Sequence, residues 1–259
     1  MLERRTLPEG PTALVSTALE DVGFLAAFTE RTGGSSEGPF RSLNLGVATK
    51  DAPERVFDNR RRISTGFGLD QMAALRQVHG STVVPVEAGP SWRGFDGGRR
   101  DVPQGDALTT ASADLGLLVL TADCVPVAMA DPVTRTLAVA HAGWRGVAAG
   151  VLMQVVATFP EPGRVRAAVG PAIGPDHYEV GEEVVAAVAS ASIGGAITTG
   201  LAVRPHLDLP GTVAQILGEL GVRHIERSEE CTACLPDRFF SYRRDGPTGR
   251  QALIAVRLS

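Results

Sequence analysis

Lysine, aromatic residues and excess positive charge are all scarce in this 259-residue chain. Its 25 basic residues include a single lysine, Lys50, so an enzyme that forms a Schiff base would depend on that residue alone. Aromatic residues are 5% of the chain, too few for a base-stacking surface unless several of them cluster. The net charge of -4 provides no overall positive field to attract a phosphate backbone. We therefore expect neither lysine-based catalysis nor a nucleic-acid partner.

Long apolar runs are also missing. The longest apolar stretch, residues 115–130, is interrupted by Thr121 and Asp123 and is too short to span a bilayer. Arg4 and Arg5 near the N-terminus are not followed by the apolar segment of a signal peptide. The 3 cysteines, an odd number, provide no disulfide framework. We expect a cytoplasmic protein with no membrane partner.

Two glycine-rich nucleotide motifs are absent. The chain contains no G-x-x-x-x-G-K-[ST] loop, and no G-x-G-x-x-G opens a helix after a strand. These absences argue against a P-loop ATPase and against a Rossmann dehydrogenase.

The middle of the chain has the clearest secondary-structure pattern. Apolar runs of strand length, rich in Val and Leu, occupy residues 115–121, 125–130 and 137–141. Continuous apolar runs predict strands that are buried on both faces. Residues 146–159 follow with apolar side chains four positions apart, which predicts a helix.

The remaining segments alternate irregularly. Residues 52–64 predict a helix with Pro53 in its first turn. We also predict strands at 75–78, 82–86, 164–169 and 251–258, helices at 182–190 and 207–220, and loops at 32–38 and 89–105. This order is not a clean βαβ series, so we expect one α/β domain over residues 1–259, with mixed sheets and helices outside.

Reactive side chains recur where apolar strands end beside glycine. Cys124 follows one strand in Thr121-Ala-Asp-Cys, His141 ends another in Ala-His-Ala-Gly-Trp-Arg-Gly, and His79 lies in Gln77-Val-His-Gly. Glycine lets the backbone approach a ligand closely. One cysteine and two histidines can hold zinc and leave the fourth tetrahedral position open, which is the catalytic pattern.

The residues alone leave this metal site open. His79 and Cys124 are 45 positions apart and Cys124 and His141 are 17 apart, which matches no standard zinc motif. A free cysteine is also among the most buried residue types and usually behaves as a small hydrophobe.

The same segments resemble a known bacterial family. It has long been labelled "multicopper polyphenol oxidase, laccase domain", is also called the peptidoglycan editing factor family, and is regarded as purine nucleoside phosphorylase-like. The resemblance rests on the three segments above and runs from about Thr29 to the C-terminus. Further matching motifs are Ser42-Leu-Asn-Leu-Gly46, Asp58-Asn-Arg60, Gly170-Pro-Ala-Ile173, Tyr178-Glu-Val-Gly181, Leu207-Asp-Leu209, Cys231-Thr232, Phe239-Phe-Ser-Tyr-Arg-Arg244 and Thr248-Gly-Arg250.

The resemblance implies a site and a fold. It implies that His79, Cys124 and His141 bind one zinc ion and form the catalytic centre. It also implies that Asn44, Gln77 and Arg243 surround the same pocket as substrate-binding residues. The implied fold is a single α/β sandwich, in which two sheets are flanked by helices.

The implied activity is phosphorolysis of adenosine, inosine, guanosine or methylthioadenosine, with hydrolytic deamination of adenosine as a second reaction. Zinc suits deamination because it lowers the pKa of bound water. Purine nucleoside and phosphate would be the partners. The laccase label fails a ligand count, because the chain has 5 histidines and no His-x-His pair for a copper cluster. We therefore do not expect laccase activity.

Arginine suits bidentate phosphate binding, and four arginines lie in the matching motifs. The candidates are Arg60, Arg145, Arg243 and Arg244, each with an ordinary structural role as the alternative. The Cys231-Thr-Ala-Cys234 segment lacks the context of a redox or zinc pair, and we interpret it as structural or incidental. His177, His206 and His224 have no motif context, so we expect surface or hydrogen-bonded histidines.

Two other functions use the same residues. Cys124 as nucleophile with His141 as base would make a cysteine hydrolase, for example one that edits a peptidoglycan precursor. A non-enzymatic protein that binds a small molecule or a partner is the other alternative. Stoichiometric zinc on Cys124 would argue against the hydrolase, and nucleoside binding without turnover would favour the binding protein.

Overall fold

The computed structural model describes residues 2–8, 10–88, 95, 102–199 and 204–259. Most of the predicted loop at 89–105 lies outside these residues. Within the described chain, no helix is both long and apolar enough to cross a membrane.

Two six-stranded sheets form the centre of the molecule. The first sheet has the order β1 (Leu2–Thr6), β2 (Thr12–Ser16), β3 (Phe24–Thr29), β14 (Gln251–Arg257), β7 (Leu115–Thr121) and β4 (Gln71–Ala74). The second sheet has the order β13 (His224–Arg227), β10 (Arg166–Val169), β8 (Val125–Asp131), β9 (Thr136–Ala142), β6 (Ala107–Thr110) and β5 (Val83–Pro85). A two-stranded ribbon, β11 (Thr198–Thr199) with β12 (His206–Leu207), lies apart from both sheets.

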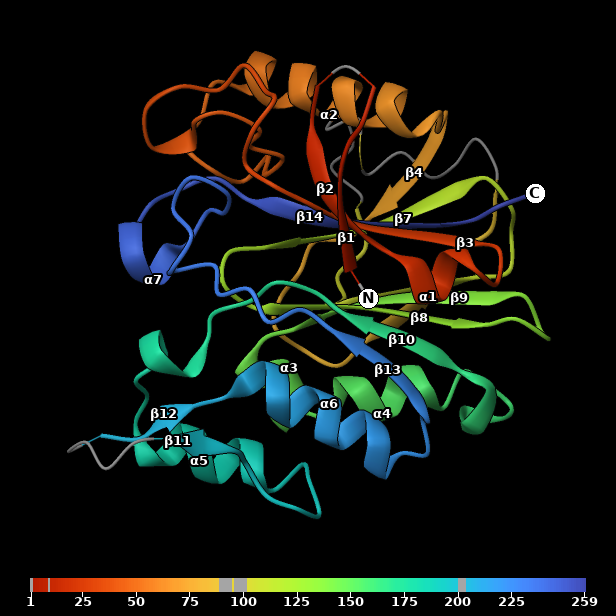
Figure 1. The fold of residues 1–259 in the computed structure, drawn as a ribbon, viewed down its shortest axis with the longest axis vertical. Coiled ribbons are helices and arrows are strands. Elements are labelled where there is room, and N and C mark those ends of the chain that lie inside the picture. The colour runs from red at the N-terminus through yellow and green to blue at the C-terminus, as the bar shows by residue number, and fades with distance from the viewer. Residues whose placement is uncertain (1, 9, 89–94, 96–101, 200–203) are drawn as a thin grey trace.

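Helices cover the two outer faces (Figure 1). Helix α2 (Pro53–Phe67) lies over the first sheet. The second sheet is covered by α3 (Trp144–Ala148), α4 (Val151–Val156) and α6 (Leu209–Glu219), and α5 (Glu182–Ala189) lies beyond α3. Short elements complete the chain: α1 (Thr17–Glu20), α7 (Tyr242–Asp245), η1 (Gly38–Phe40), η2 (Pro162–Arg164) and η3 (Pro175–His177). The predicted α/β class, two sheets flanked by helices, is confirmed.

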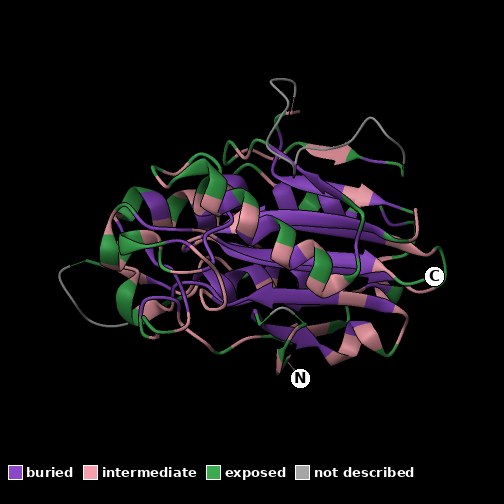
Figure 2. Cartoon of the chain, turned by 90° about the horizontal axis from the view of Figure 1, so that it is seen from above, coloured by how far each residue is buried: buried purple, intermediate pink, exposed green. Residues whose placement is uncertain are grey.

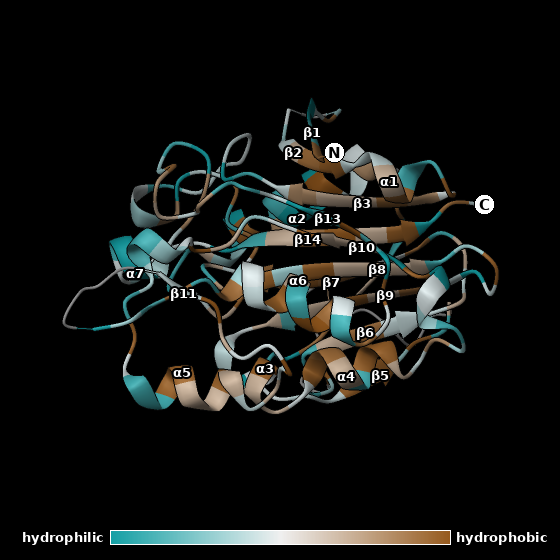
Figure 3. Cartoon of the chain, turned by 60° about the horizontal axis from the view of Figure 1, so that its bottom comes forward, coloured by the Kyte–Doolittle hydropathy of each residue, from teal (hydrophilic) through white to brown (hydrophobic). Residues whose placement is uncertain are grey.

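Burial follows these layers, because each interface between layers has its own apolar cluster. The space between the two sheets is filled by side chains such as Phe28, Leu117 and Val139. A second cluster joins the second sheet to its helices, and a third joins the first sheet to α2. The central strands of both sheets are accordingly buried over most of their length (Figure 2) and largely hydrophobic (Figure 3), whereas exposed residues gather on helices, loops and edge strands.

Two secondary-structure predictions are wrong. The helix predicted over 146–159 is two helices, α3 and α4, separated by Gly150 in the left-handed conformation (φ 83°). Its apolar residues still face one cluster, which explains the helical spacing. The strand predicted at 75–78 belongs to a loop, because β4 ends at Ala74. The predicted strands at 115–121, 125–130 and 137–141 are confirmed as β7, β8 and β9.

Candidate functional site

The three predicted metal ligands meet where the chain crosses from one sheet to the other. Strands β4 and β7 are parallel neighbours in the first sheet, so their carboxyl ends lie at the same edge. The chain leaves β7 through Cys124 to begin β8 of the second sheet, and it leaves β4 through His79 to reach β5. The β8–β9 register pairs Val125 with Ala142, which brings His141 beside Cys124.

The ligand atoms of His79, Cys124 and His141 all lie within 4.8 Å of one another. The Cys124 sulfur is 3.8 Å from Nε2 of His79. The two imidazole rings have centroids 4.8 Å apart and stand nearly perpendicular, at 78°. The structure therefore brings all three residues into one cluster, as the sequence predicts.

Asp106, which the sequence interpretation overlooked, organises this cluster from behind. Its fully buried carboxylate lies 2.9 Å from Nδ1 of His141. It also accepts hydrogen bonds from the backbone N–H groups of Val78, His79 and Gly80, at 3.2, 2.9 and 2.7 Å. His79 is held in the left-handed region (φ 59°), which is uncommon for a residue other than glycine. One carboxylate thus fixes both the His141 ring and the turn that carries His79.

Opposite charges shift the pKa values of the cluster. Burial alone would raise the pKa of the Cys124 thiol, but the charge of His141 and hydrogen bonds from both histidines lower it from 9.0 to about 6. Burial disfavours the His141 imidazolium, yet the Cys124 thiolate and the Asp106 carboxylate raise its pKa from 6.5 to about 9. Without a metal, Cys124 and His141 therefore form a thiolate–imidazolium pair at neutral pH.

Gly143 leaves just enough room for the cluster. A Cβ atom at this position would lie 2.9 Å from Cδ2 of His79 and 3.0 Å from the Cys124 sulfur. Both approaches are closer than ordinary van der Waals contact. The glycine after the predicted His141 strand is therefore required by the close approach of its backbone to two of the ligands.

The donor set fits a metal ion. One thiolate sulfur and two imidazole nitrogens match the three protein ligands of catalytic zinc sites. Asp106 supplies the carboxylate partner that fixes the ring and tautomer of a metal-ligating histidine. Because Nδ1 of His141 faces Asp106, its Nε2 is the ring atom left for a ligand or for Cys124.

A cavity of ≈ 950 Å³ opens in front of the cluster. Aromatic side chains in its wall are Trp144, Tyr178 and Tyr242. Burial, with the nearby charge of Cys124, raises the pKa of Tyr178 to about 12, so this phenol stays neutral. The residues that line the wall come from separate segments, of which the first contains Gly46 and the last contains Arg250, so early and late parts of the chain meet here.

Gln77 and Arg243, both predicted to surround the pocket, line the cavity. The side-chain amide of Gln77 is paired with the β7 backbone: its Nε2 donates to the Leu120 carbonyl and its Oε1 accepts from the Leu120 N–H, each at 2.8 Å. Arg243 donates through Nη1 to the carbonyls of Glu179 and His177, at 2.8 and 3.3 Å, and lies over the Tyr178 ring. Their contact with substrate remains a prediction.

Asn44 does not line the cavity but supports residues that do. Asn44 is fully buried, and its side-chain oxygen Oδ1 accepts hydrogen bonds from the backbone N–H groups of Gly46 and Arg250. Its amide nitrogen donates to Thr49 and Asp51. In this structure the residue shapes the cavity wall from behind.

The four candidate phosphate-binding arginines separate into two kinds. Arg145 is exposed on the cavity wall, where it stacks on Trp144, and Arg243 lies there as described. Arg60 also borders the cavity, but it is buried and donates to the backbone carbonyls of Leu45 and Phe95.

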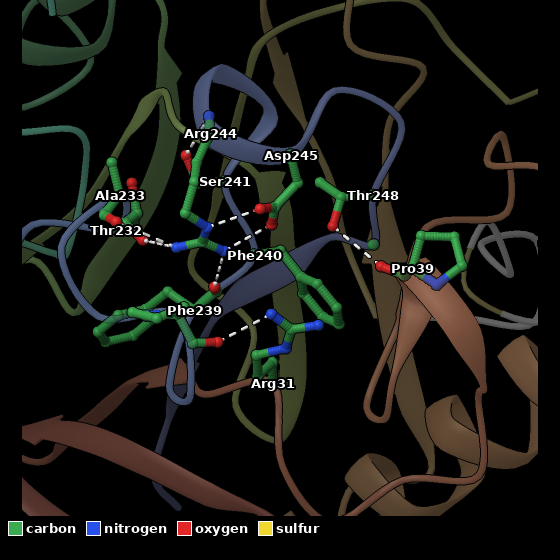
Figure 4. Close-up of polar contacts among 12 residues, drawn as sticks. Arg31, Pro39, Thr232, Ala233, Phe239, Phe240, Ser241, Arg244, Asp245 and Thr248 are labelled. Carbon is green, nitrogen blue, oxygen red and sulfur yellow. Dashed lines mark hydrogen bonds and ion pairs between the residues drawn. The ribbon is translucent and has the colours of Figure 1, made fainter. Parts of the chain in front are cut away.

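Arg244 lies outside the residues that line the cavity. Its guanidinium donates to the carbonyls of Thr232, Ala233 and Phe239 and pairs with Asp245 (Figure 4). Its hydrogen bonds therefore give it the structural role that the sequence leaves as the alternative.

The histidines without motif context do not behave alike. His224 is exposed on β13 and His206 lies 4.0 Å from Glu179. His177, in contrast, lies against Cys231 and Cys234, and the three form a second group of potential metal ligands. The interpretation of Cys231 and Cys234 as a structural or incidental pair did not include this neighbour, because His177 is more than fifty residues away in the sequence.

Comparisons with known proteins agree with this architecture. Residues 25–257 match the family model described as multi-copper polyphenol oxidoreductase laccase. The chain is 43% identical to a purine nucleoside phosphorylase of Streptomyces coelicolor over 231 residues, 87% of this chain and 92% of the relative. It is 38% identical to the purine nucleoside phosphorylase YfiH of Escherichia coli over 238 residues, 89% of this chain and 92% of the relative.

A solved structure extends the likeness over the whole chain. YlmD of Geobacillus stearothermophilus has a TM-score of 0.89 and 32% identity, with 100% of both chains covered. The family model and the relatives together show that this chain belongs to the multi-copper polyphenol oxidoreductase laccase family, whose members include proteins named purine nucleoside phosphorylase.

Proposed function

We propose that the protein is a zinc-dependent purine nucleoside phosphorylase that also deaminates adenosine hydrolytically. One observation carries this proposal: the His79, Cys124 and His141 donor set shares a single cavity with five arginines, Arg145 and Arg243 among them, and with three aromatic side chains. The names of its relatives, purine nucleoside phosphorylases at about 40% identity, support it.

The aromatic residues of the cavity suit a purine base. Trp144 and Tyr178 line the cavity, and stacking on an aromatic ring recognises a base through its π system. The cavity of ≈ 950 Å³ falls in the size range of small-molecule sites and has room for a nucleoside with a phosphate beside it. The substrates proposed are adenosine, inosine, guanosine and methylthioadenosine.

Arg145 and Arg243 are the proposed phosphate ligands. Arg145 makes no side-chain hydrogen bond with the part of the chain that the structure describes, so its guanidinium is available. Arg243 uses Nη1 for two carbonyls, and its other guanidinium nitrogens have no hydrogen-bond partner among the described residues. Arginine binds phosphate through two parallel N–H···O hydrogen bonds. Bound in this way, phosphate, the nucleophile of the reaction, would be held on one side of the ribose.

In phosphorolysis, a phosphate oxygen forms a bond to the anomeric carbon of the ribose while the bond from that carbon to the purine nitrogen breaks. The chain's part is to bind both substrates, orient them in line and exclude water. His79, Cys124 and His141 would hold a zinc ion, which supplies Lewis-acid chemistry at its open position. Asp106 keeps the His141 ring in place during these steps.

The test uses purified protein, adenosine and inorganic phosphate. Adenine and ribose 1-phosphate should form only when phosphate is present, and inosine should report deamination. Cys124→Ala and His79→Ala should lose both products, whereas His224→Ala, which changes an exposed histidine outside the cavity, should keep them. Product formation no higher than that of Cys124→Ala would overturn the proposal.

A second candidate function is a cysteine hydrolase that acts on a peptidoglycan precursor. Sulfur, imidazole and carboxylate lie in sequence from Cys124 through His141 to Asp106, and the pKa of the thiol is lowered to about 6. This is the arrangement of an activated cysteine nucleophile. Full peptide hydrolysis by metal-free protein, abolished by a thiol alkylator, would favour this function over the phosphorylase.

We further propose that residues 1–259 act as one catalytic domain in the cytoplasm. The cavity supports the single domain, since Gly46 and Arg250 line the same wall and Asn44 bonds to the backbone of both. Separately expressed halves should therefore show no nucleoside binding.

A further inference from the structure

A second group of sulfur and nitrogen donors lies outside the catalytic cluster. The Nδ1 atom of His177 lies 3.5 Å from the Cys234 sulfur and 4.0 Å from the Cys231 sulfur. All three ligand atoms are within 4.8 Å of one another. His177 and Cys234 are exposed and Cys231 is half-buried, so an ion could enter from solvent.

The backbone holds the two sides of this group together. Cys231 pairs with Ala172 in an isolated parallel bridge, and the Gly174 N–H donates to the Cys231 sulfur at 3.2 Å. A Cβ atom on Gly174 would lie 3.2 Å from Cβ of Cys231, so glycine permits this approach. The η3 turn then begins and carries His177, whose N–H donates to the Gly174 carbonyl.

The turn that carries both cysteines is anchored independently. The Thr232 hydroxyl donates to the Asp123 carboxylate at 2.6 Å. Arg244 donates to the carbonyls of Thr232 and Ala233, between the two cysteines (Figure 4). The turn is therefore fixed by contacts that do not depend on an ion, and its two sulfurs face one side chain.

The distances suit a tetrahedral ion. Zinc bonds of roughly 2.3 Å to sulfur and 2.05 Å to nitrogen place a bound sulfur and nitrogen about 3.6 Å apart. The two observed separations, 3.5 and 4.0 Å, lie on either side of that value. Two thiolates with one imidazole select a thiophilic metal over calcium or magnesium.

We propose that His177, Cys231 and Cys234 bind a second zinc ion, separate from the catalytic cluster. The ion would clamp the η3 turn to the turn at residues 231–234. Tyr178 follows His177 directly and lines the cavity, and the His177 carbonyl accepts from Arg243. The clamp is therefore structural, and it steadies the wall that carries Tyr178 and Arg243.

Metal counting tests this site without relying on activity. Full-length protein with Cys124→Ala, which damages the catalytic cluster, is titrated with Zn²⁺ and then with Co²⁺, whose thiolate charge-transfer absorption reports bound sulfur. We expect one equivalent of metal per chain in this variant and two in the unmodified protein. The Co²⁺ spectrum of the variant should show two thiolates, because Cys231 and Cys234 both bind.

Second substitutions locate the ion. Cys124→Ala combined with Cys234→Ser or with His177→Ala should lose the remaining equivalent, and both changed residues are exposed, so folding is preserved. Cys124→Ala with His224→Ala is the matched control and should keep it. The proposal is overturned if the Cys124→Ala protein binds no metal, or if the two combined variants keep their equivalent. A disulfide between Cys231 and Cys234 that forms in place of metal binding would also overturn it.

Discussion

The Nδ1 atom of His141 and a carboxylate oxygen of Asp106 lie 2.9 Å apart, both buried. The same carboxylate binds three consecutive backbone N–H groups of the turn that carries His79. One side chain thus sets the positions of two of the three proposed metal ligands. Asp106 is therefore a positioning residue on which the geometry of the whole cluster depends.

Replacing Asp106 with asparagine should weaken metal binding by the cluster without changing any of its three donor side chains. An asparagine amide nitrogen would face backbone N–H donors in place of a carboxylate oxygen, and the His141 tautomer would no longer be fixed. Loss of such a partner lowers metal affinity by about 10- to 100-fold. Competition with a chromogenic zinc chelator measures this affinity.

Asp131→Asn is the matched control for that variant. Asp131 is also fully buried, but it caps a turn through Val133 and Thr134 away from the cluster. The Asp131→Asn protein should be less stable than the unmodified protein but should keep its zinc affinity. Equal zinc affinity in the Asp106→Asn protein and the unmodified protein would contradict the positioning role.

The pH dependence of the alkylation rate of Cys124 should show whether His79 and His141 lower its thiol pKa. In the metal-free protein its thiol pKa is lowered to about 6, so the reactive thiolate forms as pH rises through about 6 and not through the ordinary value of 9.0. Iodoacetamide rates followed by peptide mass mapping should reach half their maximum near pH 6. Cys231 and Cys234, mapped in the same digest, serve as internal references.

Added zinc should protect Cys124 from the same reagent, since the sulfur would be bound to the ion. His79→Ala should reduce this protection because it removes one of the three ligands. A midpoint near 9 in the metal-free protein would show that His141 does not carry the charge assigned to it.

Gly143→Ala should disrupt the cluster by steric contact alone. The new methyl group would lie 2.9 Å from His79 and 3.0 Å from the Cys124 sulfur, so one ligand must move. We expect lower zinc occupancy and a lower Tm, measured by metal analysis and calorimetry. Gly218→Ala on α6 is the control: nothing lies within 4 Å of its Cβ position, and alanine in a helix should stabilise the fold by roughly 0.5–1 kcal/mol.

The strands that the sequence predicts are those whose burial leaves a strong local pattern. β7, β8 and β9 are covered on both faces, so nearly all their residues are apolar and the pattern is unmistakable. Strand β1 lies at a sheet edge with Arg4, Arg5 and Glu3 exposed or half-exposed, and its pairing with β2 sets its structure. Tertiary pairing of this kind leaves no apolar run to detect.

The site residues divide in the same way, into those with a clear local sequence pattern and those brought together only by the folded chain. Cys124 follows β7 and His141 lies near the end of β9, and both strands are long and apolar, so these strand-end positions are visible in the sequence. Asp106 instead comes directly before β6, after a stretch rich in glycine and proline that hides the start of this short strand. The group of His177 with Cys231 and Cys234 depends on the bridge between Ala172 and Cys231, which only the folded chain creates.

Substitution by glutamine should change phosphate binding at Arg145 but fold stability at Arg244. Arg145 is exposed on the cavity wall and stacks on Trp144, so Arg145→Gln should raise the KM for phosphate about 10-fold or more, with little change in Tm. Arg244 holds three backbone carbonyls outside the cavity, so Arg244→Gln should destabilise the fold by roughly 2–3 kcal/mol. In the folded fraction of the Arg244→Gln protein the phosphate KM should stay unchanged, because the Arg244 side chain does not line the cavity.

Phosphate-dependent initial rates and thermal unfolding separate the two effects, with Arg164→Gln, which changes an exposed arginine outside the cavity, as the reference. An unchanged phosphate KM in Arg145→Gln would remove this residue from the phosphate site and leave Arg243 as the remaining proposed ligand.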